Sequence, residues 1–391
     1  MLLRRIFIPF LLAALPIAAI TAVILAHKKA ALHKKDIPQT KTAVSFGTSC
    51  WRIFRGSRQL SGFAEGDLPA RLAIRWKFKT GAAVKSTPVV AEGRVYLTST
   101  DKKIYALDLN TGALLWKKDL EGEIEASALA VEDAVYVGTM DGQFYALSAA
   151  DGSIRWRYPT KDKIAGSANA AGDIILLGSY DGLLHAISPQ GRLVWSYKTK
   201  SYINGTAAVT ETAAVVGGCD AYLHIIPLTD PNQVRRIDTG SYIPSSPAVF
   251  ENLAYVGNFD GQVLCVDLQS DSIVWTCDNP NESFFAVPAV NDQYAVIGSR
   301  QNKLICLDRR TGKEIWKFAT EDAVNSSPVI CGSKVIFGAD DGFLRILNLA
   351  DGKEVWSANL AQPIASGPAV VENCVLVGCD DGYVYVFSAI N

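Results

Sequence analysis

The sequence predicts an all-β fold, an eight-bladed β-propeller of four-stranded blades, because three kinds of residue recur together about every forty positions. Tryptophan marks the first column, with Arg235 at the place of one missing member: Trp76, Trp116, Trp156, Trp195, Trp275, Trp316 and Trp356. Glycine marks the second: Thr98 and then Gly138, Gly178, Gly217, Gly257, Gly298, Gly338 and Gly378. Aspartate marks the third: Asp101, Asp141, Asp181, Asp220, Asp260, Gln301, Asp341 and Asp381. One period shared by three columns indicates a repeat architecture, and a unit of this length is typical of a propeller blade.

Each unit is expected to contain four short strands separated by turns. In the second unit, β-rich runs occupy residues 127–131, 134–138, 143–148 and 153–158, bounded by Asp-Gly and similar turns. The runs are nearly continuously apolar, as expected when both faces of a blade pack on its neighbours. Each Trp falls in the outermost strand, where its large area can fill the widening wedge between adjacent blades.

The ring is expected to close through a strand from the N-terminal side. The last unit ends after its third strand, within residues 364–388, whereas an unpaired strand with Trp76 stands in front of the first unit at residues 72–79. We expect this N-terminal strand to complete the last blade, so that residues 72–391 make up the propeller.

The segment before the propeller divides into three parts. Residues 6–26 are uncharged, mostly apolar and long enough to span a bilayer, and Arg4 and Arg5 precede them. Residues 1–26 are therefore expected to be one transmembrane signal anchor or a cleaved signal peptide. Residues 27–50 are expected to form a flexible basic tether, and residues 51–71 a lead-in segment. Lysines follow the apolar run closely, so charge counting alone does not orient the chain in a membrane.

The charge is unevenly distributed along the chain. Residues 1–35 hold six Lys or Arg and no acidic residue, so the rest carries 32 basic against 39 acidic residues, a net charge of −7. This body lacks the basic footprint of a nucleic-acid-binding protein. The eight cysteines form no C-x-x-C pair and are expected to be buried apolar residues or to form one or two bridges. With only four histidines, no His-rich metal site is expected.

The first strand of each blade is expected to line the axis, where room is least. Small residues stand there in seven of the blades: Ser86–Thr87, Ala126–Ser127, Gly166–Ser167, Gly205–Thr206, Ser245–Ser246, Ser326–Ser327 and Ser366–Gly367.

The repeat resembles that of the PQQ-like (pyrroloquinoline-quinone-type) β-propeller family. The motif Ala-x-Asp-x-x-Thr-Gly-x-x-x-Trp stands intact as Ala106, Asp108, Thr111, Gly112 and Trp116. The lead-in, with Trp51, Phe54, Arg55, Gly56 and Gly62, also resembles a segment found ahead of many such propellers. The resemblance covers about residues 51–391. It implies either a quinoprotein dehydrogenase with PQQ and Ca²⁺ at the axis or a non-enzymatic scaffold, such as the BamB-like component of outer-membrane protein assembly.

The residues favour the scaffold branch. A quinoprotein site needs a catalytic carboxylate, oxygen ligands for Ca²⁺ and usually a Cys-Cys ring, and the chain has no Cys-Cys pair. The Asp column is interpreted as a turn device, because Asp before Gly suits a tight connection. His185 and His224 take third-strand positions where Tyr105, Tyr145 and Tyr385 stand in other blades, which predicts aromatic packing rather than metal binding. We therefore expect no catalytic, cofactor-binding or metal-binding residues.

The better binding surface is expected where the connections between blades and the Asp-Gly loops share one rim. Tyr202 and Tyr242 are neighbours there, with Phe285 at the next blade, and an aromatic cluster of this kind is typical of a partner-binding patch. Partly buried loop packing is the alternative explanation. The resulting hypothesis is a monomeric, non-catalytic scaffold that binds protein or peptide partners in the cell envelope. It would be anchored to the inner membrane through residues 6–26, or periplasmic or secreted after cleavage. The alternative is a small PQQ-dependent oxidoreductase with calcium, and a third possibility is an envelope sensor domain.

Overall fold

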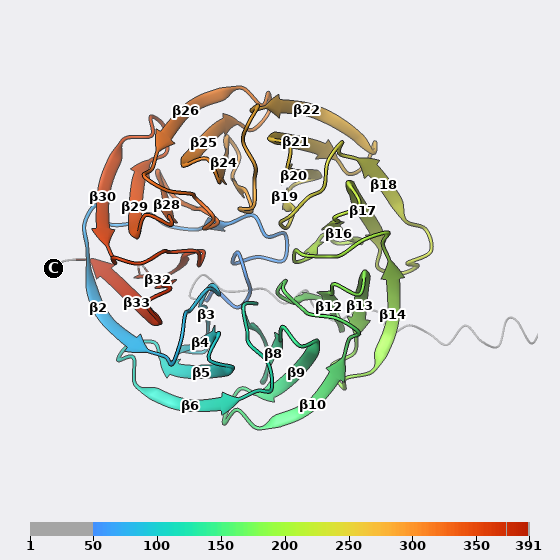
Figure 1. Ribbon diagram of the computed structural model, residues 1–391, viewed down its shortest axis with the longest axis vertical. Helices are drawn as coiled ribbons and strands as arrows, with labels where there is room; N and C mark the ends of the chain where they lie inside the picture. Colours follow the sequence, from blue (N-terminus) through green and yellow to red (C-terminus); the bar gives the residue numbers. More distant parts are fainter. Residues whose placement is uncertain (1–49, 373, 390–391) are drawn as a thin grey trace, which may run out of the picture. The chain divides into compact units, whose positions relative to one another are not determined.

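The computed structural model describes residues 50–372 and 374–389, which form a ring of eight sheets around a central axis (Figure 1). Each sheet contains a blade of four antiparallel strands, and the sheet of blade seven has one further strand, β1 (Phe63–Ala64). The blades are numbered here one to eight in chain order from β3 (Val89–Ala91). The predicted eight-bladed, all-β propeller is confirmed. The predicted membrane segment, residues 6–26, and nearly all of the predicted tether lie outside the described residues. Within the described part of the chain, no helix has the length and apolar character needed to cross a membrane.

The strands of blades one to seven follow one another from the axis to the periphery in chain order, whereas blade eight takes its outermost strand from the N-terminal side of the chain. The innermost strands are β3, β7 (Leu129–Val131), β11 (Asn169–Ala171), β15 (Ala208–Val209), β19 (Ala248–Phe250), β23 (Ala289–Val290), β27 (Val329–Cys331) and β31 (Ala369–Val371). The second strands are β4 (Arg94–Ser99), β8 (Ala134–Gly138), β12 (Ile174–Gly178), β16 (Ala213–Gly217), β20 (Leu253–Gly257), β24 (Tyr294–Ser299), β28 (Lys334–Gly338) and β32 (Cys374–Gly378). The third strands are β5 (Lys103–Asp108), β9 (Gln143–Ser148), β13 (Leu183–Ile187), β17 (Tyr222–Pro227), β21 (Gln262–Asp267), β25 (Lys303–Asp308), β29 (Phe343–Asn348) and β33 (Tyr383–Ala389). The outermost strands are β6 (Leu114–Asp119), β10 (Ile154–Pro159), β14 (Leu193–Lys198), β18 (Arg235–Asp238), β22 (Ser272–Asp278), β26 (Glu314–Ala319), β30 (Glu354–Asn359) and β2 (Leu72–Lys79).

The ring closes as predicted. Strand β2 is the outermost strand of blade eight, in the order β2-β33-β32-β31, and pairs antiparallel with β33 so that Trp76 faces Val386. The N-terminal and C-terminal ends of the propeller therefore share one sheet, and separating them would break a complete strand ladder.

Tryptophans of the repeated column form hydrogen bonds between neighbouring blades. The indole N–H of Trp76 donates to the Leu109 carbonyl of blade one over 2.9 Å, and that of Trp116 donates to Ala149 of blade two over 3.1 Å. Trp156, Trp275 and Trp316 make the same bond to the following blade. Each of these five rings lies against a positive-φ glycine of that blade, so close that a Cβ there would come within 2.5–2.7 Å of the indole. The Thr-Gly turn of the repeat motif is therefore the docking point for the Trp.

The glycine column is needed for a different contact between blades. A Cβ on Gly138 would lie 2.3 Å from Cγ2 of Ile164, which precedes the innermost strand of the next blade. Gly178 and Ile203 repeat the contact, also at 2.3 Å. Since real Cβ atoms do not approach this closely, glycine lets the buried Ile of the next blade pack directly on the β-strand backbone.

The lead-in crosses the centre of the ring and binds one inner strand after another (Figure 1). Trp51 exchanges backbone hydrogen bonds of 2.9 and 2.8 Å with Val90 of blade one. The carbonyls of residues 52, 58, 59, 61 and 62 then accept backbone N–H groups from blades two, four, five, six and seven. Strand β1 (Phe63–Ala64) ends the path by pairing in parallel with β27 of blade seven. The lead-in is thus an integral part of the propeller, and it plugs the axis on one side.

Candidate functional site

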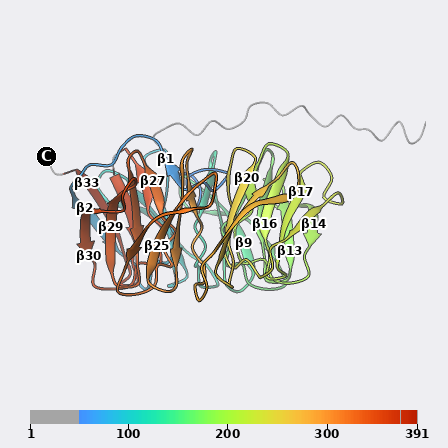
Figure 2. The same ribbon diagram turned by 90° about the horizontal axis from the view of Figure 1, so that it is seen from above.

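The two faces of the ring are built from different loops (Figure 2). The connections between blades and the turns between second and third strands lie on one face, here called the mouth face. The lead-in and the remaining turns lie on the other, here called the plug face. This arrangement places the loops singled out in the sequence on a common rim, as expected.

The three predicted binding residues belong to a larger group of rings on the mouth face. Tyr242 stacks on Phe259 with ring centroids 4.5 Å apart, and Phe259 meets the edge of Phe285 at 6.2 Å. Tyr202, whose side chain is 51% exposed, stacks on Tyr180 at 5.1 Å. We call these five residues the aromatic arc; it extends from blade three to blade six.

Sequence reasoning missed Tyr180 and Phe259, although a signal was present. Each stands one position before an aspartate of the Asp column, Asp181 and Asp260, in the turn between second and third strands. That turn was interpreted only as a connection. In blade five this turn meets the incoming connection, and the backbone N–H of Phe259 donates to the Tyr242 carbonyl. In blade three the ring of Tyr180 instead stacks on Tyr202, which lies in the connection that leads to blade four.

Cationic side chains flank both ends of the arc. Lys163 Nζ lies 4.2 Å from the ring centroid of Tyr180, and Arg300 Cζ lies 4.8 Å from that of Phe285. A hydrogen bond of 2.6 Å from Tyr180 Oη to Asn204 Oδ1 holds the first ring in place. The arc is therefore an ordered aromatic surface edged by positive charge.

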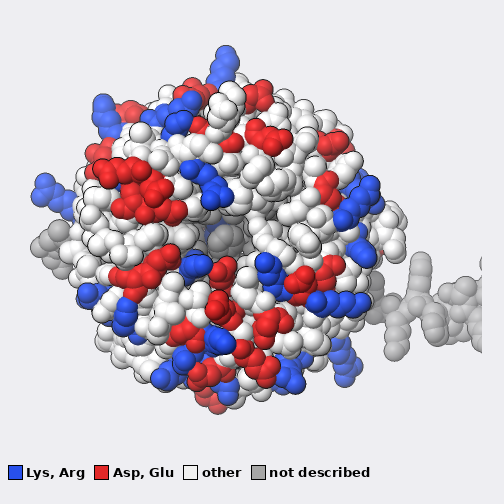
Figure 3. Space-filling view, viewed as in Figure 1, with Lys and Arg blue, Asp and Glu red and all other residues white. Residues whose placement is uncertain are grey.

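The opposite side of the mouth face is acidic. Figure 3 shows acidic side chains gathered over blades seven and eight, beside the central hollow. Asp340 and Asp380 stand in the turns of these blades; burial raises the pKa of both carboxyls, and Oδ1 of each has no hydrogen-bond partner in the described part of the chain. The other oxygen of Asp340 accepts a bond of 2.6 Å from Asn325. The mouth face thus presents aromatic and acidic halves on either side of the axis.

A cavity of about 270 Å³ opens between these halves along the axis. Its floor is Phe54 of the lead-in, and all eight blades contribute to its wall. One column of the wall carries mostly hydroxyls: Thr87, Ser127, Ser167, Thr206, Ser246, Val287, Ser327 and Gly367. Apart from Val287 of blade six, these are small axial residues predicted from the sequence.

The cavity wall does not have the donor set expected of a calcium-bound quinone site. Its one carboxylate, Glu125, is ion-paired with Lys85 over 2.9 Å. Across residues 50–372 and 374–389, no three His, Cys, Asp or Glu side chains gather where they could hold a metal ion. Since Ca²⁺ takes six to eight oxygen ligands, usually including carboxylates, these residues do not fit it.

The Asp column is more than the turn device predicted. Asp181 Oδ1 accepts the backbone N–H of Leu183 within the turn, while Oδ2 accepts the N–H of Lys161 from the preceding connection. His185 Nε2 lies 3.2 Å from the same Oδ2, and His185 Nδ1 lies 3.1 Å from Tyr158 Oη. His224 repeats the arrangement with Asp220 and Tyr197, and Tyr105 takes the same place with Asp101 in blade one. The two histidines therefore join a structural clamp between blades, as their Tyr-equivalent positions predicted.

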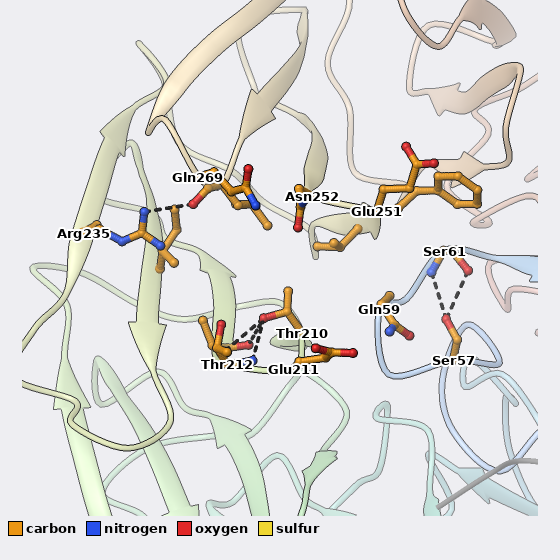
Figure 4. Close-up of a pocket in the computed structure, with 15 residues that line it drawn as sticks. Ser57, Gln59, Ser61, Thr210, Glu211, Thr212, Arg235, Glu251, Asn252 and Gln269 are labelled. Carbon is orange, nitrogen blue, oxygen red and sulfur yellow. Dashed lines mark hydrogen bonds between the residues drawn. The ribbon is translucent and has the colours of Figure 1, made fainter. Parts of the chain in front are cut away.

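A second, larger hollow opens on the plug face where the tryptophan column is interrupted (Figure 4). Arg235 replaces the Trp, and Asp271 replaces the docking glycine of blade five with φ 55°. The guanidinium donates to the Leu268 carbonyl over 2.9 Å, the bond a Trp makes elsewhere, and also pairs with Asp271. Without the bulk of an indole, a groove of about 880 Å³ remains between blades four and five.

Apart from Cys50, the cysteines within residues 50–372 and 374–389 form no disulfide. Five of the eight are buried: Cys265, Cys306, Cys331, Cys374 and Cys379. Burial raises the pKa of the Cys265 thiol to about 11 and that of Cys379 to about 12. These five cysteines are therefore buried apolar residues, one of the two predicted alternatives, whereas Cys219 and Cys277 are half-buried.

Comparison with known proteins identifies similar chains. The profile of a family described as outer membrane protein assembly factor BamB matches residues 69–277 and 260–391. No curated protein sequence matches the chain significantly. Among solved structures, BamB from Moraxella catarrhalis is 20% identical with a TM-score of 0.71, covering 82% of this chain and 98% of its own.

Two enzymes share the same fold at lower identity. Quinohemoprotein alcohol dehydrogenase from Comamonas testosteroni is 13% identical with a TM-score of 0.77, covering 89% of this chain and 82% of its own. A europium-containing methanol dehydrogenase is also 13% identical, with a TM-score of 0.72, covering 88% of this chain and 98% of its own. At these identities the likeness shows the fold alone.

Proposed function

The chain belongs to the family described as outer membrane protein assembly factor BamB, and from that premise we propose that it is a non-catalytic scaffold that binds protein partners in the cell envelope. Its partners would be proteins of outer-membrane assembly, as the family description suggests. The propeller would stand in the periplasm or outside, anchored through residues 6–26 or released from that segment by cleavage.

The aromatic arc is the observation that carries this proposal. Its rings stand on connecting loops, not in the core, and two of them, Tyr202 and Phe259, are 51% and 39% exposed. Large aromatic side chains contribute disproportionately to binding energy at protein interfaces. Ring stacking and the Tyr180–Asn204 bond hold the arc in place before a partner arrives, which lowers the entropy that binding costs. The propeller thus supplies a rigid base for an exposed, ordered contact surface.

The proposal is tested by crosslinking and capture of partners from the source envelope with the full chain. A variant with Tyr202→Ala and Tyr242→Ala should lose the partners that the wild type captures, because it removes one ring from each stacked pair. The matched control is Val194→Ala with Val274→Ala. These residues are 53% and 49% exposed on the outermost strands β14 and β22, away from the mouth face. Equal capture by both double variants would show that partners bind elsewhere.

The fold shared with two dehydrogenases favours one alternative, a PQQ-dependent oxidoreductase. Adding PQQ and Ca²⁺ to the purified full chain and measuring dye-linked oxidation of alcohols distinguishes the two functions. Sustained turnover would overturn the scaffold proposal. The absence of a bound cofactor and the monomeric state remain predictions, which the same preparation can test by absorbance and by light scattering.

A further inference from the structure

Arg55 of the lead-in is a buried cation with an incomplete set of partners. Its side chain is 1% exposed, although arginine is almost never buried without a partner. Nη2 donates to the Pro288 carbonyl over 3.0 Å, while Nε and Nη1 have no hydrogen-bond partner within the described residues. Gly62 packs so closely on the guanidinium that a Cβ there would lie 1.8 Å from Nη2. The lead-in backbone is thus shaped around this side chain.

The physical cost of this arrangement requires a compensating group. Removing a guanidinium from water costs several kcal/mol even after relaxation, and burial lowers the pKa of Arg55 to about 9, which still leaves it charged at neutral pH. A neighbouring carboxylate would offset this cost and would raise the pKa of Arg55. Burial alone accounts for the lowered pKa of Arg55, so no carboxylate of the described residues acts on it. Water could satisfy the three N–H groups of the two unpartnered nitrogens, but only an anion would also balance the charge.

The axial cavity next to Arg55 presents hydrogen-bond donors. The oxygen of Ser127 accepts the backbone N–H of Thr87 over 2.9 Å, and this pattern recurs from blade to blade around the wall. Its accepting hydroxyls are those of Ser127, Ser167, Thr206, Ser246 and Ser327. Within the described part of the chain, none of these five hydroxyls donates to a protein acceptor. Their protons are therefore available to a group in the cavity.

The cavity and Arg55 adjoin one another. Phe54, the cavity floor, precedes Arg55 in the chain. Val287, in the cavity wall, precedes Pro288, whose carbonyl accepts the bond from Arg55. The volume of about 270 Å³ corresponds to about nine waters at about 30 Å³ each, enough for a small ion with some hydration. The Glu125 carboxylate in the wall is neutralised by Lys85, and Asp340 and Asp380 are not part of the lining.

We propose that the axial cavity, with Arg55 beneath its floor, binds a small oxyanion such as phosphate, sulfate or a carboxylate. The hydroxyls around the wall supply hydrogen bonds, which are stronger to a charged acceptor than to water. The buried guanidinium supplies the balancing charge in a medium of low dielectric constant. The cavity meets the aromatic arc at Phe285, which belongs to both, but the hydroxyl column and Arg55 lie outside the arc, so anion binding and partner binding can be tested with different variants.

The test titrates the full chain with inorganic phosphate at constant ionic strength, reading binding by calorimetry and the thermal midpoint. Sulfate and citrate are titrated in parallel to distinguish the kinds of oxyanion. The ring itself suggests conservative variants, since blade six already carries Val287 in the hydroxyl column. Thr206→Val removes one hydroxyl with little change in shape, and Val287→Thr adds one. Val194→Ala, at an exposed position of the outermost strand β14, is the control.

The wild type should bind at least one of the three anions saturably. Thr206→Val should weaken binding about tenfold, the value of one hydrogen bond to a charged group, and Val287→Thr should strengthen it. Arg55→Met should bind more weakly, since it removes the balancing charge and keeps a long side chain, and Val194→Ala should bind like the wild type. Saturable binding unaltered in Thr206→Val, Val287→Thr and Arg55→Met would place the ion on the outer surface and overturn the proposal. So would the absence of saturable binding of all three anions to folded wild type.

Discussion

The interrupted tryptophan column predicts that Arg235 and Asp271 are energetically coupled. At five other junctions the indole lies against a glycine where a Cβ would come within 2.5–2.7 Å of the ring. Arg235→Trp alone would press an indole onto Asp271, and such overpacking costs about 1–3 kcal/mol. Asp271→Gly alone should be nearly neutral. It removes an ion pair whose side chains are 41% and 35% exposed, worth about 0–1 kcal/mol after solvent screening, and relieves a non-glycine residue at φ 55°.

The double variant should be more stable than the wild type. An indole in this wedge would remove about 100 Å² of apolar surface from water, since the whole side chain can bury 150–250 Å² and its counterparts here stay partly exposed. At about 25 cal/mol per Å² this corresponds to about 2.5 kcal/mol. Its N–H can keep the bond to the Leu268 carbonyl that Arg235 now makes. The four proteins should therefore show a coupling energy of at least about 2 kcal/mol.

Urea unfolding of the wild type, the two single variants and the double variant measures this coupling as a double-mutant cycle. The reverse exchange, Trp275→Arg with Gly312→Asp, is the matched control at the next junction. There each single change should destabilise, and the pair should recover part of the loss. Additivity within about 0.5 kcal/mol at Arg235 and Asp271 would refute the explanation of the altered junction.

Three further predictions follow from the same geometry. Gly178→Ala should lower the urea midpoint markedly, because its Cβ would lie 2.3 Å from Ile203, while the fold seen by circular dichroism is kept; an unchanged midpoint would contradict the close contact between blades. Burial lowers the pKa of His185 and His224, so on acidification the unfolded chain takes up protons before the folded one, and stability should fall as the pH drops below about 6.5. Changing both histidines to Tyr should reduce this dependence of stability on pH, which urea unfolding between about pH 7.5 and 5 measures. Trp76→Ala should cost about 3–5 kcal/mol, since it loosens the strand that closes the ring, and a loss below 1 kcal/mol would contradict that role.

The columns of the repeat could be predicted from the sequence because each reports a contact made in the same way by most blades. Tryptophan, glycine and aspartate recur with one period, so their spacing alone indicated eight blades, the outer position of Trp76 and closure by residues 72–79. The contacts that each of these residues makes could not be inferred from the spacing alone. Gly178 was predicted to lie in a strand, which it does, but only the structure shows Ile203 packed on its backbone.

The candidate site was only partly predictable, since it combines loops that are far apart in sequence. Tyr202, Tyr242 and Phe285 were found because they share one loop position or stand beside it. Tyr180 and Phe259 come from a different turn, and only the path of the chain brings them against Tyr202 and Tyr242.

The sequence by itself determined the architecture. Units with the same periodic pattern of large, small and acidic residues bury their apolar faces by packing on one another, and a closed ring of blades is one of the few folds that allows this. Only the tertiary structure decided what occupies the centre of that ring. Nothing in the pattern of the lead-in indicates that it contacts inner strands from blade one to blade seven, or that it buries the charge of Arg55 beside a wall of hydroxyls. Those contacts are not periodic and depend on the free edges of strands that come together only when the ring closes.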